Sequence, residues 1–236
     1  MEETIKAVLW DFGGVITSSP FEAFNRFEIQ EQIPVDFIRQ TNAENHETNA
    51  WAKLESSEIN LDEFDRLFRL ETLAKGNEIS GKAVINLLSG EIRPSMVNVL
   101  KRIKEDYIVG CITNNVNAGQ GPGMAHSKRK HDAIEEVMSN FEFIIEIRHY
   151  LFYSVMLMSN FEFIIESSKV GVRKPDPHIS KLACEQAKVS PVECLYLDDL
   201  GVNLKPARAM GMRTIKVFSA EQAISELEEN LGIQLT

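Results

Sequence analysis

The sequence predicts an α/β fold in which a doubly wound parallel sheet carries an inserted helical cap. Short apolar runs that end in polar residues recur along the chain, and helical patterns separate them. One long stretch after the first run has helical patterns but no convincing strand. Strands that alternate with helices form parallel βαβ units. We therefore expect an α/β core of residues 1–17 and 94–236 and a helical cap of residues 18–93.

The first expected strand, residues 6–10 (KAVLW), is a short apolar run that stops at Asp11 and two glycines. This pattern is typical of a buried parallel strand that opens into a tight loop. Four later runs have the same form, at residues 107–113, 161–166, 194–197 and 214–218. Ligands of doubly wound sheets bind beyond the carboxyl ends of the strands. The polar residues at those ends are therefore candidate site residues: Asp11, Thr113, Asn114, Asp198 and Asp199.

Cap signals mark two helices of the core. Residues 179–188 have a helical pattern, with Asp176 as the expected N-cap and Pro177 at the first helical position. Ser219 and Gln222 have the form of a capping box for a last helix over residues 221–230. Such caps pair N–H groups that a helix end would otherwise leave unsatisfied, so both helices should begin beside them.

The stretch of residues 18–93 is expected to form a cap that closes over the site. Residues 61–70 (LDEFDRLFRL) place apolar side chains at helical spacing, and Asn60 is a candidate N-cap before them. The large aromatic residues of this stretch are expected to pack its interior, although one of them could contact substrate. These residues are Trp51, Phe64 and Phe68.

The nine residues MSNFEFIIE occur twice, at positions 138–146 and 158–166. A solenoid needs several stacked units, so a local tandem duplication is the simpler interpretation. The second copy is the expected strand, because it runs directly into the segment SSKVGVRKPDP. The extra apolar segment, including HYLFYSVMLM, would then extend the sheet edge or bulge outward. An exposed run of this kind would favour a homo-oligomer.

Composition and charge exclude several classes of partner. The formal net charge of −10 argues against nucleic acid, because clustered Lys and Arg bind a phosphate backbone. The first residues lack a basic region and a small-residue cleavage site, so secretion is not expected. The most apolar stretch, residues 150–158, is expected to be too short to span a membrane. The cysteines have no metal-ligand spacing and are expected to be small buried thiols of a cytoplasmic protein. They are Cys111, Cys184 and Cys194.

The residues at the strand ends suit phosphoryl transfer. This reaction needs a nucleophile, donors around the phosphoryl oxygens, and a metal that offsets repulsion between a carboxylate and a dianion. Asp11, followed by glycines, suits attack on phosphorus, and Asp198 and Asp199 join it as hard oxygen ligands for Mg²⁺. Each residue alone could equally belong to a turn, a helix start or a solvated surface. The candidate donors are Thr113, Asn114 and Lys174.

Four segments, WDFGGVI, CITNN, GVRKPDP and LYLDDLGVNLKPARAMGM, resemble in this order the signature motifs of haloacid dehalogenase superfamily hydrolases. The resemblance covers nearly the whole chain. Within the superfamily, the chain is similar to the amino-terminal phosphatase domain of soluble epoxide hydrolases and to the corresponding domain of multidomain acyl-CoA dehydrogenases. The resemblance implies a Rossmann-like core with a C1-type helical cap. It also implies Mg²⁺-dependent hydrolysis of a small-molecule phosphate monoester.

The resemblance also implies roles for individual residues. Asp11 would be the catalytic nucleophile and would form an aspartyl-phosphate. Thr113 and Asn114 would bind the phosphoryl group. Lys174 would bind the same group and stabilise both the nucleophile and the developing charge. The catalytic residues implied in this way are Asp11, Thr113 and Lys174.

The implied Mg²⁺ site combines side-chain and backbone oxygens. Its ligands would be the carboxylates of Asp11 and Asp199 and the backbone carbonyl of Gly13. Asp198 would support or share this role, and Asn203 would help to orient the acidic loop.

One residue departs from the pattern of the superfamily. Phosphatases of the superfamily have a second aspartate two residues after the nucleophile, which acts first as general acid and then as general base. This chain has Gly13 at that position. Loss of a general acid costs on the order of 10²- to 10⁴-fold in rate. The leading hypothesis is a phosphatase with slowed turnover, and the alternative is a phosphate-binding or regulatory domain without turnover. A dehalogenase needs no acid, but that chemistry also needs no Mg²⁺, so the Asp198–Asp199 pair counts against it.

Overall fold

The computed structural model describes residues 4–88, 90–115 and 157–235. At its centre is a five-stranded sheet in the order β3-β2-β1-β4-β5, and every neighbouring pair is parallel. The strands are β1 (Ala7–Trp10), β2 (Ile108–Thr113), β3 (Phe163–Glu166), β4 (Cys194–Asp198) and β5 (Arg213–Lys216). The predicted parallel α/β fold is confirmed.

Each expected strand is present, with ends that differ by one or two residues from the prediction. The last strand differs most, because β5 ends at Lys216 whereas the apolar pattern continued to Phe218. The backbone N–H of Phe218 donates a hydrogen bond to Oε1 of Gln222 at 2.9 Å, so Phe218 already belongs to the start of the following helix.

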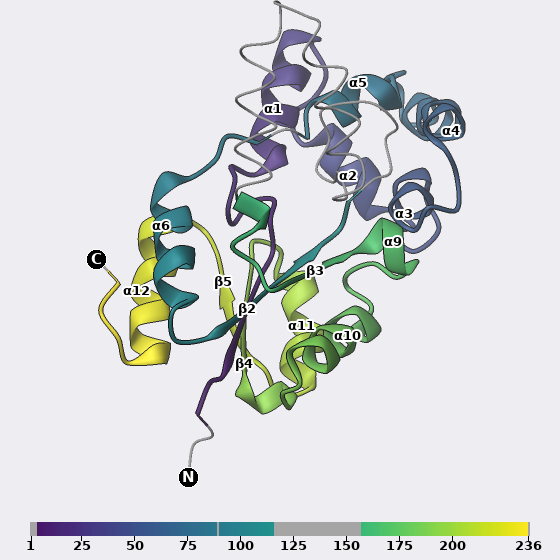
Figure 1. Cartoon of the computed structure of the whole chain (residues 1–236). Coiled ribbons are helices and arrows are strands. Elements are labelled where there is room, and N and C mark those ends of the chain that lie inside the picture. The colour runs from purple at the N-terminus through teal and green to yellow at the C-terminus, as the bar shows by residue number, and fades with distance from the viewer. Residues whose placement is uncertain (1–3, 89, 116–156, 236) are drawn as a thin grey trace, which may run out of the picture.

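Helices cover both faces of the sheet (Figure 1). One face carries α6 (Pro94–Ile103) and α12 (Ala220–Leu231), and the other carries α10 (Pro177–Ala187) and α11 (Gly201–Ala209). A four-residue helix, α9 (Ser167–Val170), follows β3, and a 3₁₀ turn, η1 (Pro191–Glu193), precedes β4. Because β1 is buried on both faces, its successive side chains enter opposite cores, which explains its continuous apolar run.

The predicted caps of the core helices are confirmed. The Asp176 side chain accepts the backbone N–H of His178 at 2.8 Å and begins α10. Ser219 and Gln222 form the reciprocal capping box of α12. The helix α10 ends one residue earlier than expected, because Lys188 adopts a left-handed conformation with φ of 55°.

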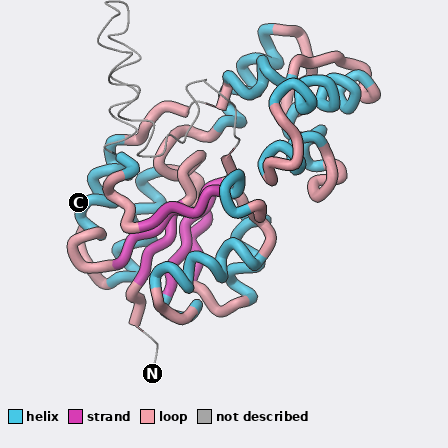
Figure 2. Tube along the Cα trace, turned by 45° about the vertical axis from the view of Figure 1, so that its right-hand side comes forward, coloured by secondary structure: helices cyan, strands magenta, loops and turns pink. Residues whose placement is uncertain are grey.

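A helical insertion follows β1 and has a hydrophobic core of its own (Figure 2). Its helices are α1 (Pro20–Gln30), α2 (Phe37–Ala43), α3 (Ala50–Glu55), α4 (Leu61–Leu73) and α5 (Gly81–Asn86). Between residues 18 and 93, the described part of the chain has no strand, and Ile92 forms an isolated bridge with Thr17. Asn60 caps α4 by accepting the Glu63 N–H at 2.9 Å. The exact limits of the cap stay a prediction.

The predicted aromatic core of this insertion is confirmed for two residues and refined for the third. Phe64 and Phe68 are fully buried, whereas Trp51 is partly exposed and stacks edge-on against Phe64. Gly81 makes close packing feasible here, because a Cβ at its position would lie 2.7 Å from the Phe64 ring.

The second MSNFEFIIE copy supplies β3, as predicted. Its residues pair in parallel register with β2, from Gly110 opposite Phe163 to Thr113 opposite Glu166. The first copy and most of the apolar segment between the copies lie outside the described residues. The homo-oligomer expected from that segment therefore stays a prediction.

Two further expectations concern the cysteines and the membrane. All three cysteines are buried and unbridged, as predicted. Among the described residues, no helix combines the length and the apolarity that crossing a bilayer requires.

Candidate active site

The site lies where the carboxyl ends of three neighbouring strands meet. Asp11 directly follows β1, Thr113 is the last residue of β2, and Asp198 is the last residue of β4. Because β1 lies between β2 and β4, with Trp10 in register with both neighbours, these residues come to one edge of the sheet. The sequence predicted this meeting point from the strand ends alone.

Lys174 joins this edge from the loop between α9 and α10. Its Nζ lies 2.7 Å from Oδ1 of Asp11 and 2.9 Å from Oδ2 of Asp198, and its side chain is 3% exposed. Asp11, Asp198 and Asp199 each place one carboxylate oxygen within 4.8 Å of the others. Four of the predicted residues therefore form one cluster, in which Asp11, Lys174 and Asp198 are buried and Asp199 is partly exposed, and Thr113 lines the cavity beside it.

Asp198 is the fully buried centre of a hydrogen-bond network. Its oxygens accept from Lys174 Nζ, from the Tyr196 hydroxyl at 2.7 Å, and from the backbone N–H of Leu200 at 2.8 Å. The Asn203 amide donates to both oxygens, at 3.0 and 3.1 Å. Because so many donors hold Asp198, this carboxylate is fixed in place and organises the loop. The contact expected from Asn203 is present.

Asp199 is in a different environment. Its Oδ2 accepts from the Ser19 hydroxyl at 3.2 Å and packs against the backbone of Gly14. A Cβ at Gly14 would lie 2.2 Å from that oxygen, and Gly14 has a φ of +76°, so this position requires glycine. At Gly13, by contrast, a Cβ would meet nothing within 4 Å. The position that lacks the second aspartate therefore has open space for a side chain.

The charges of the cluster shift the proton affinities of its members. Burial raises the pKa of Asp11 well above its usual range; Lys174 lowers it in part, and the neighbouring carboxylates raise it further. Burial and then the charge of Asp198 raise the pKa of Asp199 to about 6. Burial lowers the pKa of Lys174, but the charges of Asp11 and Asp198 outweigh it and hold the ammonium group protonated.

The donor set fits a divalent cation. Three clustered carboxylates face one ammonium group, which leaves a net negative formal charge of about two when all are ionised. Such like charges are tolerated in a buried site where a cation offsets them. Carboxylate oxygens are also the ligands that Mg²⁺ prefers. Asp11 and Asp199 are better placed to hold it than Asp198, whose oxygens already accept several donors.

Asn114 clamps the backbone of Lys174. Its Oδ1 accepts the Lys174 N–H at 2.8 Å, and its Nδ2 donates to the Lys174 carbonyl at 3.0 Å. The same Nδ2 also donates to Glu55 of the insertion at 3.3 Å. Both N–H groups of this amide are therefore engaged, and direct binding of a phosphoryl group by Asn114 stays a prediction.

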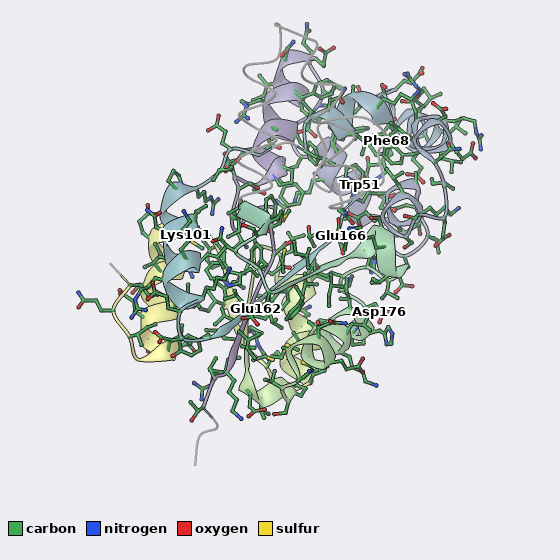
Figure 3. All side chains as sticks on the ribbon, viewed as in Figure 1. Trp51, Phe68, Lys101, Glu162, Glu166 and Asp176 are labelled. Carbon is green, nitrogen blue, oxygen red and sulfur yellow. The ribbon has the colours of Figure 1, made fainter. Side chains whose placement is uncertain are left out.

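A cavity of about 800 Å³ opens in front of the cluster and is bounded by both the core and the insertion. Asp11 is only 7% exposed, yet it lines this cavity, so the candidate nucleophile is not sealed off. In Figure 3, Trp51 of the insertion and Glu166 at the end of β3 lie on opposite sides of the junction between the two parts. The insertion contributes Phe21, Phe24, Arg39, Trp51, Glu55 and Lys82 to the lining.

Several residues of the site were not predicted from the sequence. Tyr196 could have been found, because it lies two residues before Asp198 on one strand, and alternate residues share a face. Ser19, Glu55 and Arg173 gave no local signal. Their partners are far away in the chain, and only packing of the insertion on the core brings them together.

The fold and the site define a Rossmann-like α/β protein with a carboxylate cluster at its strand ends. The family model of haloacid dehalogenase-like hydrolases matches residues 5–211, and the chain belongs to this family. The resemblance expected from the four motifs is confirmed.

Two curated relatives cover nearly the whole chain. Acyl-CoA dehydrogenase family member 10 of Mus musculus is 28% identical over 239 residues, which is 98% of this chain and 19% of that protein. Bifunctional epoxide hydrolase 2 of Mus musculus is 27% identical over 245 residues, covering 98% of this chain and 39% of that protein. The chain thus spans less than half the length of these relatives.

A solved structure shares the fold. A haloacid dehalogenase family enzyme from Bacteroides thetaiotaomicron, in complex with magnesium and inorganic phosphate, superposes with a TM-score of 0.51 at 22% identity. The match covers 89% of this chain and 93% of that one.

Proposed function

We propose that this chain is a Mg²⁺-dependent phosphatase that hydrolyses small-molecule phosphate monoesters through an aspartyl-phosphate on Asp11. The observation that carries the proposal is the contact of Lys174 Nζ with Asp11 Oδ1 inside a three-carboxylate cluster that faces a cavity. A nucleophile, a fixed positive charge and a cation site are the parts that phosphoryl transfer requires. The related enzyme that binds magnesium and phosphate supports the same assignment.

The contacts of Asp11 indicate which oxygen attacks. Among the described residues, the Phe12 N–H and the Lys174 ammonium group both contact Oδ1 of Asp11. We assign the attack to Oδ2. As Oδ2 bonds to phosphorus, the bond to the ester oxygen breaks, and the departing alcohol takes its proton from water because Gly13 offers none. A second water then attacks phosphorus and gives one proton to the hydroxide left by the first step. The bond to Oδ2 breaks, and hydrogen phosphate leaves with Asp11 restored.

The surrounding residues would hold the phosphoryl group and the metal. The Thr113 hydroxyl and the Lys174 ammonium group would bind phosphoryl oxygens, joined by Asn114 if it exchanges its longer contact with Glu55 for one of them. Mg²⁺ held by Asp11, Asp199 and the Gly13 carbonyl, with Asp198 in support, would offset repulsion between the carboxylate and the phosphate dianion. The helical insertion would act as the cap. The cytoplasmic location and the lack of a nucleic-acid partner stay predictions.

A phosphate-release screen with Mg²⁺ or with EDTA tests the proposal. We expect release that requires Mg²⁺ and that falls by about 10³-fold or more in Asp11→Asn, because the amide is nearly isosteric but is a poor nucleophile. Circular dichroism checks that the variant is folded. Phosphate release that survives the substitution would show that Asp11 is not the nucleophile.

Gly13 favours a second candidate, a phosphate-binding or regulatory domain without turnover. Gly13→Asp distinguishes the two, because the open space at this position accepts the side chain. We expect the variant to hydrolyse alkyl phosphates faster by about 10²-fold, with a smaller gain for aryl phosphates, whose leaving groups need no acid. Rates are compared on both substrates. Equal gains would contradict an acid role at this position, and inactivity of both proteins with retained phosphate binding would favour the second candidate.

A further inference from the structure

We propose that Glu55, on the helical insertion, is a positioning residue that holds the Lys174 loop in its active arrangement when the insertion packs on the core. Nothing in the motifs of the core indicates this residue. Glu55 is the last residue of α3, is 7% exposed and lines the cavity. The inference deepens the proposed function and rests on it only for its kinetic readout.

Glu55 contacts the core through one carboxylate oxygen. Its Oε2 accepts from Arg173 Nε at 2.5 Å and from Asn114 Nδ2 at 3.3 Å. Its Oε1 accepts from the indole of Trp51, one helical turn earlier, at 2.9 Å. The indole fixes the direction of the carboxylate, so the other oxygen is left to face the core.

The two core partners of Glu55 both hold Lys174. Arg173 is its neighbour in the chain, and Asn114 bonds both its backbone N–H and its carbonyl. The Lys174 side chain then reaches Asp11 and Asp198. Contacts of this type hold a catalytic group close to its productive geometry, and a displacement of about 1 Å can cost 10²-fold in rate. Glu55 therefore acts on the nucleophile through Lys174 without touching it.

Further contacts tie the same surfaces together. Arg173 Nη1 donates to the carbonyl of His46 at 2.6 Å, and the Ser57 hydroxyl donates to the carbonyl of Ser168 at 2.9 Å. These two contacts end on backbone atoms, whereas Glu55 supplies the ionised partner of Arg173. A largely buried guanidinium that loses its carboxylate is left uncompensated, so the loop should shift when Glu55 is neutralised.

The test compares Glu55→Gln with Glu58→Gln, which neutralises an exposed glutamate three residues further along the insertion. Amide-resolved hydrogen exchange reports on the Lys174 N–H, which is donated to Asn114. We expect this amide to exchange on the order of 10-fold faster in Glu55→Gln and to be unchanged in Glu58→Gln. With a chromogenic aryl phosphate and Mg²⁺, kcat should fall by about 10-fold while KM changes less, because positioning acts in the transition state.

Arg173→Gln breaks the same link from the core side and serves if Glu55→Gln does not fold. The double variant should be no worse than the more affected single variant, since both substitutions remove the shared ion pair between Glu55 and Arg173. Arg173→Gln additionally loses the contact with the His46 carbonyl, so it is expected to be the more affected of the two. Unchanged Lys174 exchange in folded Glu55→Gln or Arg173→Gln, or additive effects in the double variant, would overturn the proposal. Exchange is measured without substrate. An inactive wild-type protein would therefore contradict the proposed phosphatase activity, while the exchange rates would still test the positioning role of Glu55.

Discussion

Asp198 and Asp199 are adjacent in the chain, yet their environments give them different roles. Asp198 is fully buried and accepts donors on both oxygens. Asp199 is partly exposed, faces the cavity, and meets Gly14 and Ser19. The first carboxylate is thus suited to holding the loop and the second to binding a cation. The two residues are chemically identical, so in the sequence only the resemblance of their motif to the superfamily indicated this division.

The raised pKa of Asp199 makes the stability of the metal-free protein depend on pH. Its pKa is about 6 in the fold and 3.8 as the ordinary value, so the fold binds this proton more tightly than the unfolded chain. The stabilisation from this proton is full below pH 3.8 and is lost as pH rises through about 6. The loss amounts to about 3 kcal/mol, from the linkage of pKa to free energy.

Asp199→Asn measures this effect. In EDTA we expect the variant to gain stability relative to the wild type as pH rises from 4 to 7, in urea unfolding at each pH. In saturating Mg²⁺ the wild type should instead be more stable than the variant, because the cation favours the ionised carboxylate and binds the folded state. A stability difference that does not change with pH in EDTA would contradict the raised pKa.

Among the elements, α4 shows how local signals build the insertion. Asn60 begins this helix, and Phe64 and Phe68 on its inner face are fully buried against α3 and α5. The sequence predicted this helix and its cap from spacing alone. The helix extends three residues beyond the segment 61–70, to Leu73, because no glycine or proline stops it before Gly76.

Asn60→Ala should destabilise the insertion by about 1 kcal/mol, because the Glu63 N–H loses its acceptor at the start of α4. The free energy of unfolding in urea measures the change. Asn60→Ser is the matched control, since serine also caps and should retain most of the stability. Equal losses in both variants would mean that the lost stability does not come from the side-chain cap.

In the molecule as a whole, the core domain, with a hydrophobic cluster on each face of its sheet, meets the separately packed insertion across the cavity. The sheet and its helices form one part, the five helices of the insertion form the other, and polar contacts cross between them. Junctions with few apolar contacts are where relative motion is expected. This arrangement suits a cap that admits substrate and then closes.

Deleting residues 138–157 tests the duplication at the same scale. The deletion removes one MSNFEFIIE copy and joins Val137 to Met158, so an apolar residue takes the place of buried Leu157. Because β3 comes from the second copy, we expect the sheet to remain and the thermal midpoint to change little. Light scattering should show less self-association. Loss of folding would mean that the removed segment is part of the structure, and unchanged association would contradict its predicted role in a homo-oligomer.

Local patterns in the sequence were enough to predict the strands, the main helix caps and the order of polar residues at the strand ends. These follow from local periodicity and capping chemistry, and parallel strands bring their carboxyl ends together without further information. The contacts of Glu55 with Arg173 and of Ser19 with Asp199, which span 118 and 180 residues, became visible only in the folded protein. Such contacts depend on how the insertion packs on the core, and no short-range pattern encodes that packing.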